Sequence, residues 1–130
     1  MTKGQRELIE YWLRRADETL DEAKIMLKTN HPRGCTNRLY YACFYAITAL
    51  LLSKDLSSSK HSGVMSLFNK HFIKPGIIPV AMGKFYSGIF DNRMESDYGS
   101  WDEFENESTE NDIEQAAELI EKIASIVLSS

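Results

Sequence analysis

The chain has 130 residues and a formal net charge of −4, with 43% hydrophobic residues, 26% charged residues, seven glycines and three prolines. This composition excludes a disordered or collagen-like chain, and the length predicts a single domain over residues 1–130. No apolar run approaches the ~18 residues that a membrane span requires, and the first residues lack a signal-peptide pattern, so we expect a cytoplasmic protein.

Helical periodicity dominates the first half of the chain. Apolar residues recur every three or four positions over residues 9–27, and the Asn-His-Pro sequence at 30–32 ends this helix because a residue before proline leaves the α region. A second helix is expected over about 32–54. No residue in 39–52 is charged, which is typical of a helix in the middle of a bundle.

The second half of the chain also shows helical patterns. A short third helix is expected over about 59–72, and a Lys-Pro-Gly turn at 74–76 precedes a fourth helix that begins near Pro79. A capping box at 109–112 starts the last amphipathic helix. No segment alternates like a strand for more than a few residues. The sequence therefore predicts an all-α, up-and-down bundle of four to five helices.

Motifs for metal and nucleotide chemistry are absent from the sequence. It contains no glycine-rich phosphate loop, HExxH, EF-hand loop or Glu-x-x-His pair, so we predict no metal and no cofactor. Cys35 and Cys43 lie about 12 Å apart on one predicted helix, beyond the roughly 7 Å limit for a disulfide. We expect both thiols to be buried and reduced.

The segment NRLYYACFYA carries the first candidate site. It places Arg38, Tyr41 and Tyr45 on one helical face, with Asn37 beside them. An arginine among tyrosines combines positive charge with stacking surface, which suits phosphates and bases. The same aromatic residues can instead be core or interface residues with a hydroxyl at the rim.

Basic residues are concentrated in the middle of the chain. Residues 31–90 contain seven basic and one acidic side chain, whereas 91–130 contain two basic and twelve acidic side chains. The basic middle can form a face that attracts phosphates, or the acidic last segment can lie against it and neutralise it. Lys60 and His61, at the start of the third helix, are candidates for a phosphate contact or are exposed capping residues.

A third candidate site lies at the end of the fourth helix. Arg93 continues the apolar stripe of Tyr86 and Ile89, and Asp97 follows four residues later. An acid after a base, near a helix carboxyl end, is locally unfavourable. This placement favours a tertiary role for Asp97, such as orienting Arg93, unless residues 95–99 have already left the helix and are solvated.

Three motifs together make this sequence resemble the HEPN superfamily. They are NRLYYACFYAITALL at 37–51, KHSG at 60–63 and R-x-x-x-D-Y-G at 93–99. Within that superfamily, the sequence is similar to small stand-alone proteins whose second helix begins with an Asn-Arg-x-Tyr-Tyr-Ala-x-Phe pattern. The resemblance implies a helical bundle that dimerises and takes part in prokaryotic toxin–antitoxin and defence systems, often beside a small nucleotidyltransferase.

The resemblance also implies a possible activity, because many HEPN proteins cleave RNA without a metal through an R-x4–6-H motif in this same helix. Arg93 matches the arginine of the motif, but none of the residues at 98–100 is histidine, and Met94 replaces the polar residue common after the arginine. Neither Asp97 nor Tyr98 has an ordinary pKa near neutrality, as the transfer of a 2′-hydroxyl proton requires.

We therefore expect a HEPN-like module that binds a nucleotide, RNA or a cognate nucleotidyltransferase and does not catalyse efficiently. One alternative is a metal-independent ribonuclease toxin in which Arg93, Asp97 and Tyr98 replace the usual pair. Another is a dimeric scaffold without a ligand. The aromatic residues of the second helix and the resemblance both favour a homodimer, in which the two Arg93 side chains approach a shared groove for an anion.

Overall fold

The computed structural model describes the backbone of residues 1–98 and 106–129, and the side chains of residues 1–92 and 110–129. Its elements are α1 (Lys3–Lys28), α2 (Pro32–Leu52), α3 (His61–Phe68), the short π-helix η1 (Asn69–Ile73), α4 (Val80–Tyr98) and α5 (Asn106–Leu128). No strand occurs in these ranges, which confirms the all-α prediction. No helix within them combines the length and apolar character that crossing a membrane would require.

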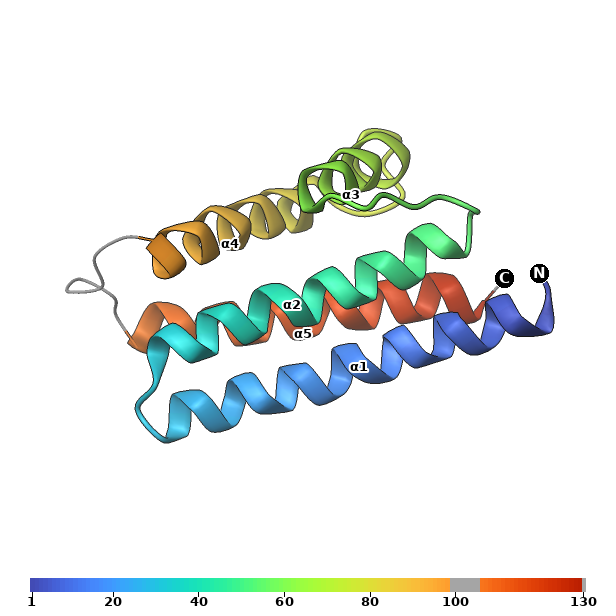
Figure 1. Cartoon of the computed structure of the whole chain (residues 1–130). Coiled ribbons are helices and arrows are strands. Elements are labelled where there is room, and N and C mark those ends of the chain that lie inside the picture. Colours follow the sequence, from blue (N-terminus) through green and yellow to red (C-terminus); the bar gives the residue numbers. More distant parts are fainter. Residues whose placement is uncertain (99–105, 130) are drawn as a thin grey trace.

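The long helices run alternately up and down (Figure 1). α2 lies in the middle, with α1 on one side and α3 and α4 on the other, and α5 packs along both α1 and α2. α4 runs antiparallel to α2, so its carboxyl-terminal turns approach the amino-terminal end of α2 (Figure 1). This arrangement brings the motifs of α2 and α4 to one side of the bundle.

α2 forms the centre of the core, as its uncharged sequence predicts. Eleven of its 21 residues are buried, among them both cysteines, which are free. Tyr40, which the sequence placed among the aromatic residues of a dimer interface, is instead fully buried within its own chain. The alanines of α2 that face its neighbours, Ala42, Ala46 and Ala49, have no exposed surface.

One local and two long-range hydrogen bonds lie at the ends of the first two helices. The Thr2 hydroxyl caps α1 by accepting from the backbone N–H of Gln5 at 3.0 Å. Gln5 in turn ends α2 from a distance, because its Nε2 donates to the Leu52 carbonyl (2.7 Å) and to Asp55 Oδ1 (2.9 Å). Asp55 adopts a left-handed conformation with φ of 59°. α2 therefore stops two residues before the end expected from periodicity.

The later helices differ from their expected bounds. α3 begins at His61 and is continued by η1, so the expected 59–72 helix is shorter and partly π-helical. α4 begins one residue after Pro79, close to the expected start. α5 begins at Asn106, which puts Thr109 inside its first turn. The prediction that Thr109 caps this helix was therefore wrong.

One half-buried carboxylate on α5 predicts a pH effect on stability. Burial raises the pKa of Asp112 above its ordinary 3.8. The folded state thus binds this proton more tightly than the unfolded state, and stability falls as the pH rises from 3.8 through the folded-state pKa. We expect Asp112→Asn to raise the melting temperature at pH 7, with a difference that shrinks as the pH approaches 4. The control is Glu114→Gln, which removes an exposed charge from the same helix; equal effects of the two substitutions would contradict the burial argument.

Candidate functional site

Two helices build one surface from arginines and aromatic rings. Arg38, Tyr41 and Tyr45 of α2 lie beside Trp12 and Arg15 of α1, and we call these five residues the aromatic–arginine face. The guanidinium carbon of Arg38 lies 5.6 Å from the centre of the Tyr41 ring, and that of Arg15 lies 5.4 Å from the Tyr45 ring. The Trp12 ring stacks on Tyr45 at 5.2 Å. Each arginine is therefore held over a tyrosine ring.

Neighbouring polar groups fix both guanidinium groups. Arg38 donates to Asn37 Oδ1 at 2.8 Å and lies 3.5 Å from Glu22 of α1. Arg15 lies 3.3 Å from Glu18, and hydrogen bonding to Tyr45 and Glu18 raises the pKa of Arg15 above its ordinary value. The two glutamates offset part of the positive charge of the face.

His61 packs against α2 next to this face. Its Nδ1 lies 2.9 Å from the Tyr40 hydroxyl, its ring stacks on Phe44 at 4.4 Å, and it meets the edge of Tyr41 at 5.9 Å. It begins α3 and is half-buried, so His61 lies in the cap region as expected, but the expectation that it is exposed was wrong. Of the residues predicted to bind, the structure brings together Asn37, Arg38, Tyr41, Tyr45 and His61.

The loop before α3 explains why glycine stands at position 63, the last residue of the K-H-S-G sequence. A Cβ atom on Gly63 would overlap the Ser58 hydroxyl, and that hydroxyl also accepts a hydrogen bond from the backbone N–H of Lys60 at 3.2 Å. A side chain at position 63 would therefore displace the turn that leads into α3. Lys60 itself is exposed, and no described contact joins its side chain to the aromatic–arginine face.

Buried tyrosines connect this region with α4. The Tyr40 ring stacks on Tyr86 at 5.8 Å and meets Phe90 at 5.7 Å. Burial, together with the Tyr40 hydroxyl, raises the pKa of Tyr86 far above its ordinary value. Tyr86 therefore stays neutral and cannot accept a proton as a general base.

The predicted catalytic residues follow on the same helix. Arg93 lies about one turn beyond Phe90, and α4 remains helical through Tyr98. The backbone of residues 95–98 has therefore not left the helix, contrary to one of the alternatives. The side chains of Arg93, Asp97 and Tyr98 lie outside the described residues. The carboxyl-terminal turns of the α4 backbone lie toward the amino-terminal end of α2 (Figure 1).

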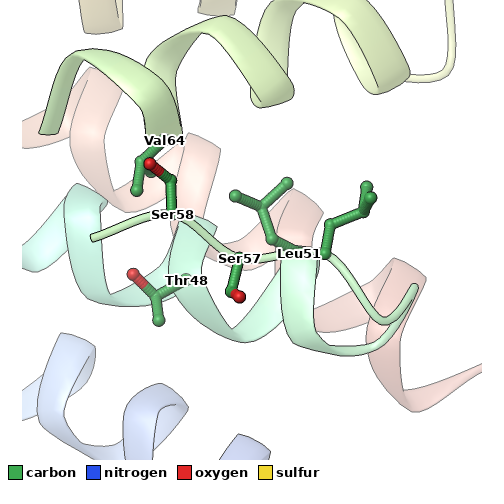
Figure 2. A pocket seen from close by; sticks show the side chains of 6 residues that line it. Thr48, Leu51, Ser57, Ser58 and Val64 are labelled. Carbon is green, nitrogen blue, oxygen red and sulfur yellow. The ribbon is translucent and has the colours of Figure 1, made fainter. Parts of the chain in front are cut away.

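The hollow between α2 and the segment before α3 is too small for a nucleotide. It has a volume of about 30 Å³, room for one or two water molecules (Figure 2). Its lining residues are Thr48, Leu51, Leu56, Ser57, Ser58 and Val64. None of the five residues of the aromatic–arginine face lines this hollow, and all five are partly exposed.

The α1 side of the face was missed from the sequence. Trp12 fits the apolar stripe of its helix and packs against the core, and Arg15 carried no signal beyond its charge. A single helical pattern shows which residues of that helix share a side, but it does not show which residues of another helix lie opposite. Pairing two helices was needed to find Trp12 and Arg15.

The chain is similar to several known proteins. The sequence pattern of the family described as "HEPN domain" matches residues 9–129. A "UPF0332 protein" of Thermotoga maritima is 46% identical over 121 residues, which cover 93% of this chain and 92% of that protein. Two proteins of Methanocaldococcus jannaschii also match. "Putative toxin MJ0605" is 32% identical over 95% of this chain and 91% of its own length, and "Putative toxin MJ0142" is 31% identical over 82% and 71%.

Proposed function

The chain belongs to the HEPN domain family, and on this premise we propose that it is the HEPN module of a prokaryotic toxin–antitoxin or defence-type system. In this role it binds single-stranded RNA or a nucleotide at the aromatic–arginine face without efficient cleavage. The names of two relatives support the setting, since both are called "Putative toxin". The geometry of the face supports the ligand.

The observation that carries the proposal is the pairing of two guanidinium groups with two tyrosine rings, all four side chains being partly exposed. Trp12 extends the rings on α1 and His61 extends them toward α3. Unpaired bases stack on aromatic rings and on arginine for about 1–3 kcal/mol per base, with little sequence preference. Because Glu18 and Glu22 offset the arginine charges, stacking contributes more here than attraction to phosphate, and binding should depend only weakly on salt.

Substitutions in the face test this function. With a fluorescently labelled 20-nucleotide oligouridylate as the probe, we expect Tyr41→Ala and Arg38→Ala each to weaken binding by about tenfold, as the loss of one stacked base implies. Tyr41→Phe keeps the ring and should bind like the wild type. Arg6→Ala removes an exposed arginine of α1 and serves as the matched control. Anisotropy unchanged by wild-type protein, with both oligouridylate and ATP, would contradict the proposal.

The absence of efficient cleavage rests on the residues at 98–100, none of which is histidine. The RNA recovered from the binding mixtures should therefore be intact. Cleavage by the wild type but not by Arg93→Ala would favour the alternative, a metal-independent ribonuclease that uses Arg93, Asp97 and Tyr98.

We further propose a homodimer and a cognate nucleotidyltransferase as partners. Leu8 and Tyr11 remain 45% and 42% exposed on α1 beside the face, and tyrosine, tryptophan and arginine are enriched in protein interfaces. A second copy that covers them would place the face at the rim of a groove between the two chains. Sedimentation at micromolar concentration should give a species of twice the chain mass of 14.9 kDa. A single species with the mass of one chain would reject the dimer.

A further inference from the structure

One corner of the bundle carries positive charge with no acidic residue in its sequence. Residues 56–90 contain four lysines and neither aspartate nor glutamate. Lys70 of η1, Lys74 after it and Lys84 of α4 are all exposed. Two aliphatic side chains of the connecting segment, Ile77 and Val80, are also 48% and 57% exposed. We call these five residues the basic corner.

The segments that carry the basic corner are packed together. A Cβ atom on Gly83 would lie only 3.0–3.1 Å from the side chain of Ile73, so the first turns of α4 lie directly on η1. The connecting turn is held by hydrogen bonds from Gly76 N to the Ile73 carbonyl (3.0 Å) and from Ile78 N to the Phe72 carbonyl (2.9 Å). Lys74 and Lys84 lie next to these contacts, so the two lysines are carried by segments that pack against each other.

The acidic helices do not neutralise this corner. α3 and η1 have α2 and α4 as their main neighbours, and lie on the side of α2 away from α1 (Figure 1). α5, which carries most of the described acidic residues after position 90, packs mainly along α1 and α2 and makes only a small contact with α4. Asp55, the one acid in residues 31–90, accepts a hydrogen bond from Gln5 of α1. The corner thus differs from the aromatic–arginine face, where each arginine has a glutamate beside it.

We propose that the basic corner is a docking site for an acidic segment of a separate protein, one that presents glutamate or aspartate together with apolar side chains. Lysines attract the acids, and Ile77 and Val80 offer apolar surface that a purely ionic ligand would leave exposed. Phe68 and Phe72 are buried, and Phe85 and His71 are only partly exposed, so this region offers little stacking surface for unpaired bases.

A second copy of the chain fits this corner less well. Its acidic residues lie mainly on α1 and within residues 91–121. A contact between one of these acidic segments of one copy and the corner of another joins two different surfaces. Such head-to-tail contacts form open chains or rings and do not close as a two-fold dimer. The docking proposal is therefore separate from the proposed homodimer, and it does not depend on RNA binding.

Charge reversal in the full-length chain tests the proposal. The probe is a labelled 20-residue amphipathic peptide with glutamates on one helical face and leucines on the other, and its counterpart with glutamine in place of glutamate is the control peptide. We expect the glutamate peptide to bind, and Lys74→Glu with Lys84→Glu to weaken binding at least tenfold. Ile77→Ser should weaken it several-fold. Lys3→Glu with Lys24→Glu makes the same charge change on exposed positions of α1 and should leave binding unchanged.

Three results would overturn the proposal. The first is equal binding of the two peptides, and the second is an equal loss of peptide binding in the corner and control variants. The third is that the glutamate peptide does not bind, whereas oligouridylate or phosphatidylserine vesicles bind and the corner variants abolish that binding. Circular dichroism of each variant verifies that it is folded. Because Arg38→Ala and Tyr41→Ala lie outside the corner, they should retain peptide binding even where RNA binding is lost, which separates failure of this proposal from failure of the RNA proposal.

Discussion

Replacing Tyr40 by alanine is expected to lower the free energy of unfolding by about 3–5 kcal/mol, the usual cost of deleting a large buried ring. Tyr40 has no exposed surface and contacts the rings of Tyr86, Phe90 and His61. These rings come from α3 and α4, so the substitution removes the contacts that hold both helices on α2. Chemical denaturation measures the loss, against a typical total stability of about 5–15 kcal/mol.

Two further substitutions separate the parts of this effect. Tyr40→Phe keeps the ring and removes only the hydroxyl that bonds to His61, so it should cost about 1 kcal/mol. Tyr11→Ala deletes the same atoms as Tyr40→Ala from a side chain that is 42% exposed, and we expect it to cost less than half as much. Equal losses for the two alanine variants would show that Tyr40 is not the centre of the core.

Enlarging Ala46 is expected to destabilise the fold by about 1–3 kcal/mol, because overpacking forces neighbouring side chains and backbone to move. Ala46 has no exposed surface, and α1 also places fully buried alanines, Ala16 and Ala23, in the core. Small residues on both helices let α1 and α2 approach closely. Ala46→Leu should therefore lower the melting temperature by several degrees in a thermal scan.

A matched substitution outside the core provides the control for Ala46→Leu. Ala81 lies in the first turn of α4 and is exposed, so Ala81→Leu adds the same three carbons where space is available, and its effect should stay within about 0.5 kcal/mol. If Ala46→Leu melts at the wild-type temperature, the packing of α1 against α2 differs from the arrangement in Figure 1.

Periodicity predicted the helices well because each helix buries one side, and burial imposes a repeat of three and four residues that the sequence records. The ends were harder to predict. α2 stops where Gln5, 47 positions earlier than Leu52, donates to its last carbonyl, and no local pattern contains that partner. The capping prediction for Thr109 failed for the same reason. It was based on a local sequence pattern, but α5 begins three residues before Thr109.

The candidate site was predicted in part for a related reason. Asn37, Arg38, Tyr41 and Tyr45 share one helix, so their spacing alone shows that they are neighbours. His61 joins them through Tyr40 and Phe44, and Trp12 and Arg15 join them from α1. These contacts depend on how three helices pack. A sequence taken one helix at a time does not contain that information.

The two buried thiols of α2 offer a way to watch this helix open. Burial, with a smaller effect of Asp112, raises the pKa of Cys35 to about 12, and burial raises the pKa of Cys43 further. At pH 7 only about one Cys35 in 10⁵ is a thiolate, the form that reacts with alkylating reagents. Labelling of the native protein therefore waits for local or global opening. The two alkylation rates, resolved by mass spectrometry, would report the opening of α2 at two points eight residues apart without any engineered substitution.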